Sequence, residues 1–279
     1  MLVDDVLQTF ETAIQENALK ASHRFLGPGR IAATLSLIML SLLLNLGAAV
    51  GAQAPPSYDA KMIAVAKTAA TLELMERLNA FVKATTASGL TCAIAPPKLV
   101  IEDVPSYGSY DPDTNALRSS LWELLQPKER GIFFRMAAAA QGPGPEPDEA
   151  AARREFETGV HHWVFVHELG HWWQACRKVN DGRKPYAFEY EADRIAAAYW
   201  REHDPAVAHH MDEGFQVIVA HSPNPVPPGQ ETAKYFNDNY EKLGPTPAYI
   251  WFQSQMCVTA FAEKPAPSFL QTLHETGRP

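Results

Sequence analysis

A long stretch without proline is the feature that most constrains how this 279-residue chain folds. It covers residues 150–183, is rich in apolar and aromatic residues, and contains the pattern His167-Glu168-x-x-His171. Such a stretch predicts one long buried helix, running from Asp148 as its N-cap to about Arg177. Residues four apart share one face of a helix, so we expect the imidazoles of His167 and His171 to lie side by side.

Two imidazoles one helical turn apart are suited to hold one zinc ion. Glu168 would lie at the edge of the same face, where its carboxylate can take a proton from a water molecule and pass it to a leaving amine. The sequence therefore predicts zinc-assisted hydrolysis, with Glu168 as general base. The alternative is a buried helix whose two histidines only form hydrogen bonds within the core. His161 and His162 do not share the ligand face, and we expect them to be ordinary helix histidines.

A second helical segment, residues 187–200, carries Glu189 and Asp193, again four apart on one face. The two segments together, His-Glu-Leu-Gly-His followed by Phe-Glu-Tyr-Glu-Ala-Asp-Arg, resemble the gluzincin clan of zinc metallopeptidases over roughly residues 160–200. They are also similar to small bacterial putative metallopeptidase families. The metzincin spacing is excluded, because Gln174 and Arg177 stand where that class has glycine and histidine.

The resemblance implies that Glu189 is the third zinc ligand. It also implies that Asp193 accepts the second N–H of a ligand histidine and fixes its tautomer. Glu191 is the competing ligand, but it lies about 200° around the helix from Glu189. We expect Glu191 on a solvated or ion-paired face, with Arg194 as its partner.

Cysteine does not add a further ligand. The chain holds Cys92, Cys176 and Cys257, whose spacing forms no metal site. Outside the cytoplasm one pair could form a disulfide, and the sequence leaves all three pairings open.

The N-terminal part predicts an exported protein. Residues 1–30 form a cytoplasmic or leader region, and residues 31–50 carry no charge over a length that can span a bilayer. Basic residues precede this segment and none follows until Lys61, which places the rest of the chain outside the cytoplasm. We expect residues 31–52 to be a signal peptide cut after Ala52, or else a membrane anchor. The catalytic domain then covers residues 57–279, in the periplasm or outside the cell.

The remaining pattern predicts an α+β fold that is mostly helical. Expected helices and strands are listed by residue range: helices at 57–86 (capped by Ser57 or Asp59), 121–126, 129–140, 206–220 and 248–262; strands at 97–104, 107–110 and 116–118. The gluzincin resemblance implies a zincin-like fold, with the small sheet before the metal helix. In such a fold an edge strand, here 107–110 or 116–118, binds the substrate backbone.

These observations predict a zinc metallopeptidase that acts on a peptide or protein. Its oxyanion donor stays open among four candidates: His221, Tyr235, Tyr240 and Tyr249. A net charge of −8 without a basic cluster argues against nucleic acid as a partner. Two alternatives remain: an inactive zinc-binding interaction or structural module, and a membrane-tethered binding protein whose motif is accidental.

Overall fold

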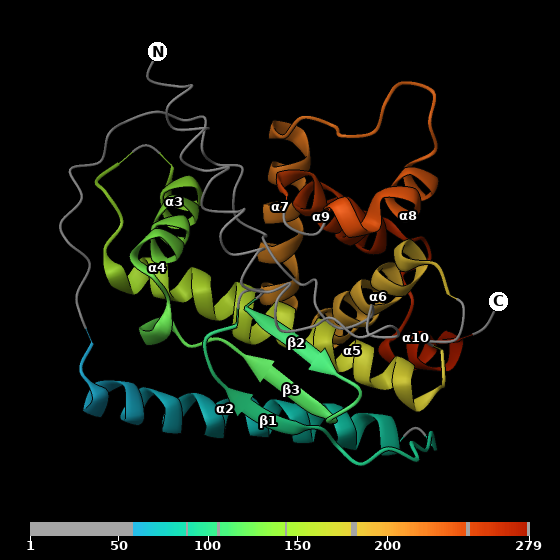
Figure 1. Ribbon diagram of the computed structural model, residues 1–279, viewed down its shortest axis with the longest axis horizontal. Helices are drawn as coiled ribbons and strands as arrows, with labels where there is room; N and C mark the ends of the chain where they lie inside the picture. The colour runs from blue at the N-terminus through green and yellow to red at the C-terminus, as the bar shows by residue number, and fades with distance from the viewer. Residues whose placement is uncertain are drawn as a thin grey trace.

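The computed structural model describes residues 58–87, 89–104, 107–142, 144–179, 183–243 and 246–277. This part of the chain is mostly helical and carries a small three-stranded sheet, as expected for the α+β class (Figure 1). The predicted leader and the segment 31–52 lie outside the described residues. None of the described helices is both long and apolar enough to cross a bilayer.

Helix α2 (Ala60–Ala87) supports one side of the molecule. Asp59, one of the two expected caps, accepts a hydrogen bond from the Met62 amide at 2.8 Å. The other candidate, Ser57, lies outside the described residues. Leu74, Leu78 and Phe81 recur at helical spacing and are buried against the sheet and α5. The predicted amphipathic helix is therefore confirmed.

The sheet consists of β1 (Lys98–Ile101), β2 (Gly108–Asp111) and β3 (Ala116–Ser119), in the order β1-β3-β2. β2 runs antiparallel to β3, whereas β1 runs parallel to it. Of the two segments expected at an edge, β2 is indeed an edge strand. The expectation for residues 116–118 is wrong, because β3 pairs on both sides.

The predicted metal helix is continuous from α4 (Glu149–Phe156) to α5 (Phe165–Cys176), and Asp148 caps it by accepting from the Ala151 amide at 2.8 Å. Its middle, Glu157–Val164, is a π-helix, which the sequence pattern did not indicate. In this segment the His161 carbonyl accepts from Arg77 Nη1 and the His162 carbonyl accepts from the Trp200 indole. Donors from other elements thus support a wide turn, and a periodicity within one segment cannot reveal them.

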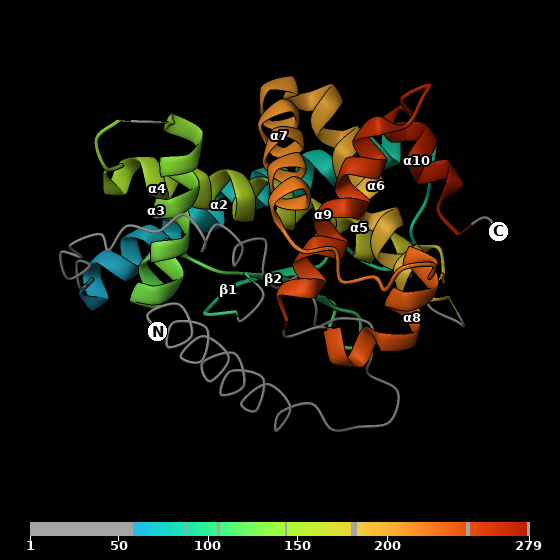
Figure 2. The ribbon, with the colours of Figure 1, turned by 90° about the horizontal axis from the view of Figure 1, so that it is seen from above.

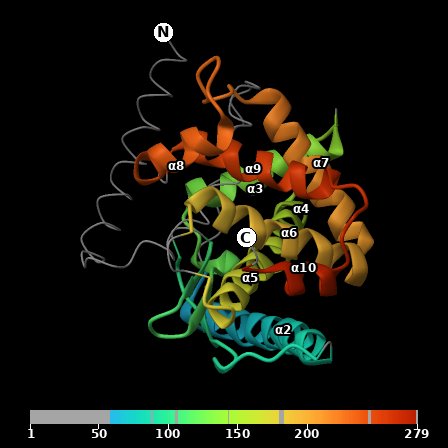
Figure 3. The same ribbon diagram turned by 90° about the vertical axis from the view of Figure 1, so that its right-hand side faces the viewer.

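The C-terminal half is a set of helices packed around α6 (Pro185–His203). These helices are α7 (Pro205–His221), α8 (Thr232–Leu243), α9 (Pro247–Ala262) and α10 (Phe269–Glu275). Before the metal helix, the chain also forms a 3-10 turn at Trp122–Leu124 and helix α3 (Pro127–Gln141). Seen from above, α3 and α4 stand together at one side of the molecule, away from α8 and α10 (Figure 2). The side view places α5 and α6 between α2 below and α8 and α9 above (Figure 3). The metal motif therefore lies in the centre of the fold.

A disulfide ties the segment before β1 to the end of α5. It joins Cys92 and Cys176, whose Cα atoms are 5.0 Å apart. Cys257 is a buried free thiol on α9. Of the three pairings that the sequence left open, the structure thus selects one.

Candidate metal centre

The two motif helices approach each other at Gly170 of α5 and Ala192 of α6. A Cβ added to Gly170 would lie 3.1 Å from the Ala192 Cα and 3.2 Å from its Cβ. Both positions need small side chains for this close packing. The approach brings α6 residue Glu189, one turn before Ala192, over the histidines of α5.

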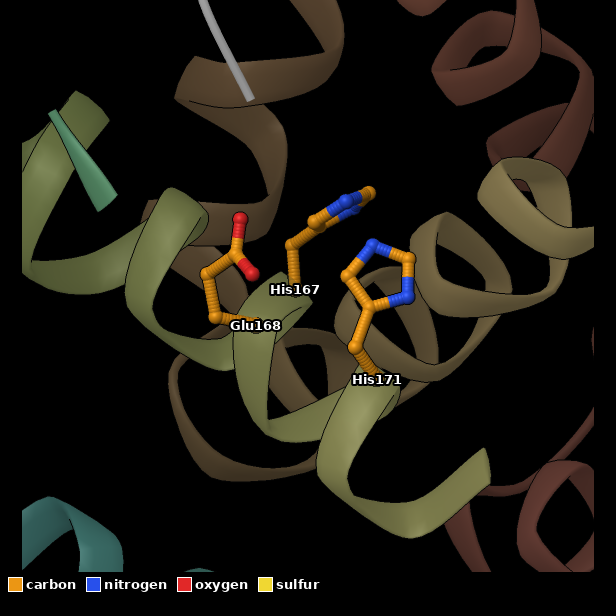
Figure 4. Close-up of side chains that lie close together, drawn as sticks. All are labelled: His167, Glu168 and His171. Atoms are coloured by element: carbon orange, nitrogen blue, oxygen red, sulfur yellow. The ribbon is translucent and has the colours of Figure 1, made fainter. Parts of the chain in front are cut away.

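Three donor atoms converge at this crossing. His167 Nε2 lies 3.4 Å from Glu189 Oε2, and His171 Nε2 lies 3.6 Å from the same oxygen. The ligand atoms of His167, Glu168 and His171 lie within 4.8 Å of one another (Figure 4). All four side chains are at least 94% buried. The structure therefore brings together the four residues that the motif predicts.

The spacing of these donors fits a zinc ion. Nitrogen and oxygen ligands at about 2.0–2.1 Å from a tetrahedral zinc lie roughly 3.4 Å from each other. The two His–Glu189 separations, 3.4 and 3.6 Å, agree with that value. In addition, His167 Nε2 is buried and has no hydrogen-bond partner among the described residues. The donor set His167, His171 and Glu189 thus fits zinc, whereas Glu168 is the additional carboxylate beside it.

Each histidine is oriented through its other ring nitrogen. His167 Nδ1 lies 2.8 Å from Asp193 Oδ1, and a carboxylate can only accept, so Nδ1 carries the proton and Nε2 keeps its lone pair. His171 Nδ1 lies 2.7 Å from Gln174 Oε1 in the same arrangement. The amide of Gln174 is oriented in turn, because its nitrogen donates to the Phe188 carbonyl at 2.7 Å. Asp193 occupies the place expected for it, whereas sequence reasoning missed Gln174.

Glu191 does not reach the metal centre. Gln174 Nε2 donates to Glu191 Oε2 at 3.0 Å, and Arg183 Nη1 lies 2.6 Å from the same oxygen. Of the two kinds of face expected for Glu191, solvated or ion-paired, the structure has the ion-paired one, since Glu191 is only 8% exposed and pairs with Arg183. Its expected partner was wrong: Arg194 pairs with Glu263 and Glu275 instead. Glu191 therefore supports His171 indirectly, through Gln174.

Glu168 is positioned by the edge strand. The Tyr110 amide of β2 donates to Glu168 Oε2 at 2.8 Å. This contact needs a close approach of β2 to the metal helix, which Gly108 permits: a Cβ there would lie 2.6 Å from Val164 Cγ1 and 3.5 Å from Glu168 Cγ. The edge of β2 that does not pair with β3 therefore faces the carboxylate of the predicted base.

Glu189 is held by two side chains that the motif does not contain. The Tyr240 hydroxyl donates to Oε1 at 3.0 Å, and Gln253 Nε2 donates to Oε2 at 3.1 Å. Among the four candidates for an oxyanion donor, Tyr240 thus contacts the centre through Glu189. The Tyr249 hydroxyl lies 2.6 Å from Gln253 Nε2 and contacts the centre through that side chain. The other two candidates lie elsewhere: Tyr235 stacks on Phe252, and His221 is exposed at the end of α7.

The electrostatics of the centre favour a cation. Burial lowers the pKa of His167, but Asp193 and Glu189 outweigh it and hold this pKa well above its ordinary value. Burial raises the pKa of Glu189, yet the neighbouring imidazoles of His167 and His171 keep it well below the usual range. Three buried carboxylates thus surround two imidazoles, and the cluster needs positive charge, from protons or from a metal ion.

The neighbouring histidines take no part in the centre, as expected. His161 Nε2 lies 3.0 Å from the Ser120 carbonyl, and His162 stacks on Trp200.

Three comparisons were made with known proteins. Neither the family models, nor the curated proteins, nor the solved structures gave a match.

Proposed function

We propose that this chain is a zinc-dependent metallopeptidase of the gluzincin type with a zincin-like fold. The observation that carries the proposal is the convergence of His167, His171 and Glu189 at the spacing of zinc ligands, with Glu168 beside them. These three residues would hold the zinc ion. When bound, zinc would polarise the scissile carbonyl and make a water molecule more acidic.

The protein's own groups would move the proton and place the substrate. Glu168 takes a proton from the attacking water and passes it to the leaving amine. The Tyr110 amide fixes one oxygen of this carboxylate, so the base does not have to be ordered during the reaction. β2 is an edge strand beside Glu168, and an extended peptide would add along it.

The main alternative is an inactive structural zinc site. Structural sites usually have four protein ligands. Cys176, which follows His171 on the same helix, is bound to Cys92 in the disulfide and cannot serve as a thiolate ligand. A carboxylate beside three ligands, held by a backbone amide, has no use in a structural site. Both observations favour the enzyme.

The proposed location is outside the cytoplasm. The Cys92–Cys176 disulfide supports it, because such bonds persist in oxidising compartments. The proposal includes both alternatives for residues 31–52: a signal peptide that is cleaved, or an anchor that holds the chain at the membrane.

Hydrolysis of an unfolded protein such as casein by the full chain tests the function. We expect activity with about one zinc per chain, its loss on chelation and its return with added zinc. Glu168→Gln should keep the zinc and lower the rate by about 10²–10⁴-fold. Zinc without hydrolysis of casein or of a varied peptide library would support the structural alternative. Full activity in Glu168→Gln would refute the role of the base.

A further inference from the structure

A cavity of about 160 Å³ lies against the π-helical segment, at the opposite end of the metal helix from the zinc ligands. It is lined by α2, by the segment around the 3-10 turn, and by the helix at residues 153–161. Its volume is large enough for several water molecules or for a small organic ligand. This cavity is separate from the metal centre, and the proposed function makes no use of it.

The walls of the cavity carry more acceptors than donors. Glu73, Glu123, Glu157 and His161 line it, and Arg153 is the one guanidinium among its lining residues. That guanidinium is already engaged, since Arg153 Nη1 lies 2.6 Å from Glu123 Oε1. Arg77, beside the cavity on α2, lies with Nη1 3.1 Å from Glu73 Oε1, so three carboxylates face two guanidinium groups.

Two of the acceptor atoms are buried without a partner. Glu123 Oε2 and His161 Nδ1 have no hydrogen-bond partner among the described residues. His161 is only 4% exposed, and its Nε2 donates to the Ser120 carbonyl at 3.0 Å. The Nδ1 of the neutral ring therefore keeps its lone pair, which lies 4.0 Å from Glu73 Oε2. A buried acceptor without a donor is costly, so these atoms call for a ligand that donates hydrogen bonds.

The spacing of the acceptors distinguishes an ammonium group from a metal ion. Two acceptors of one ammonium nitrogen, each about 2.9 Å away, lie roughly 4–5 Å apart, whereas two zinc ligands lie roughly 3.4 Å apart. The separation here is 4.0 Å. Among the described residues, the three possible metal ligands that lie within 4.8 Å of one another are His167, Glu168 and His171 of the candidate metal centre, and the carboxylates of the cavity do not form such a group.

The rest of the wall is apolar and would take a short hydrocarbon stem. It is formed by Ala66, Ala69, Ala70, Leu121, Trp122 and Phe156. Burial and the charge of Glu73 raise the pKa of Glu157 by more than the neighbouring guanidinium groups of Arg153 and Arg154 lower it.

We propose that this cavity binds a small primary alkylammonium ligand, with Glu73, Glu157 and the Nδ1 of His161 around the ammonium group and the apolar wall around the alkyl chain. The assignment is independent of the peptidase proposal.

Equilibrium dialysis of the zinc-loaded full chain against labelled butylamine at neutral pH, where the amine is protonated, tests this assignment. We expect one butylammonium per chain. Glu73→Gln and Glu157→Gln should each weaken binding by about tenfold or more, since each removes a charged acceptor. Glu76→Gln is the matched control: it removes the same charge from an exposed position on α2 and should leave the affinity unchanged. Zinc content should be the same in all three variants.

Three results would overturn the assignment. The first is the absence of saturable butylammonium binding. The second is equal binding of n-butanol, which would show an apolar cavity without cation recognition. The third is a second zinc ion that is lost in Glu157→Gln, which would show a metal site instead. Circular dichroism of both glutamine variants would verify that each is folded.

Discussion

The candidate metal centre and the cavity belong to one continuous helix and use histidine in the same way, yet we propose different cations for them. In both, one ring nitrogen donates to a fixed oxygen: His167 Nδ1 to Asp193, and His161 Nε2 to the Ser120 carbonyl. In both, the other nitrogen is buried without a hydrogen-bond partner. His167 and His171 Nε2 lie 3.4 and 3.6 Å from Glu189 Oε2, whereas His161 Nδ1 lies 4.0 Å from Glu73 Oε2 in the cavity.

The origin of this difference is how close the neighbouring elements come. At the metal centre, the Gly170–Ala192 contact lets α6 press Glu189 onto two imidazoles. At the cavity, the walls enclose open space, and a single imidazole faces separate carboxylates. The same residue types thus produce a zinc-like cluster only where the backbones pack closely.

The largest expected effect is the difference in zinc affinity between a change at His171 and the same change at His161. His171→Ala should weaken zinc binding by more than the roughly 10–100-fold that is typical for loss of a residue that only orients a ligand. His161→Ala, the matched change on the same helix, should leave zinc affinity unchanged. Competition with a fluorescent zinc chelator measures both. Equal losses in the two variants would contradict the division of the helix into two sites.

Next in size is the effect of the residues that orient the imidazoles. Gln174→Ala and Asp193→Ala should each lower zinc affinity by about 10–100-fold, because each removes the acceptor that fixes a ligand tautomer. The same competition assay applies. Unchanged affinity in both variants would mean that the histidines are held by packing alone.

Gly108→Ala tests the contact between β2 and the metal helix. The added methyl would lie 2.6 Å from Val164 Cγ1, so the strand must shift away from Glu168. We expect a loss of about 1–3 kcal/mol in the free energy of unfolding, and a lower kcat with zinc retained. Chemical denaturation and peptide hydrolysis measure these two quantities.

The double variant Gly108→Ala, Val164→Ala supplies the control for this prediction. It makes room for the methyl group and should restore part of kcat, because the Tyr110 amide can again reach Glu168. A kcat that stays at the level of Gly108→Ala would argue against the positioning of the base by β2.

The smallest effect is expected at Tyr240. Tyr240→Phe removes one hydrogen bond to Glu189 Oε1, worth about 0.5–1.5 kcal/mol, and should weaken zinc binding only several-fold. A loss as large as that of His171→Ala would mean that Tyr240 does more than hold this carboxylate.

The local pattern was sufficient to predict much of this molecule. The helix predicted over residues 57–86 agrees with α2, and the four-residue spacing of the motifs agrees with the shared faces of α5 and α6. Asp193 was expected beside a ligand histidine and is found at 2.8 Å from His167. These features depend on one segment, or on two segments with a strong joint signature.

The features that were missed depend on contacts between distant segments. Gln174 orients His171 only because the Phe188 carbonyl and Glu191, both on α6, receive its amide protons. Arg194 was expected as the partner of Glu191, because the segment that carries both residues does not reveal the approach of Arg183. The π-helical segment and the cavity likewise arise where α2 meets the metal helix, and no pattern within either helix encodes that meeting.

The central claim is that Glu189, and not Glu191, completes the zinc site. Zinc content per chain, measured by mass spectrometry on the wild type, Glu189→Ala and Glu191→Ala, tests it most directly. We expect about one zinc in the wild type, most of it lost in Glu189→Ala, and most of it kept in Glu191→Ala. Loss of zinc only in Glu191→Ala would contradict the ligand assignment, and a folded wild type without zinc would contradict the metal centre itself.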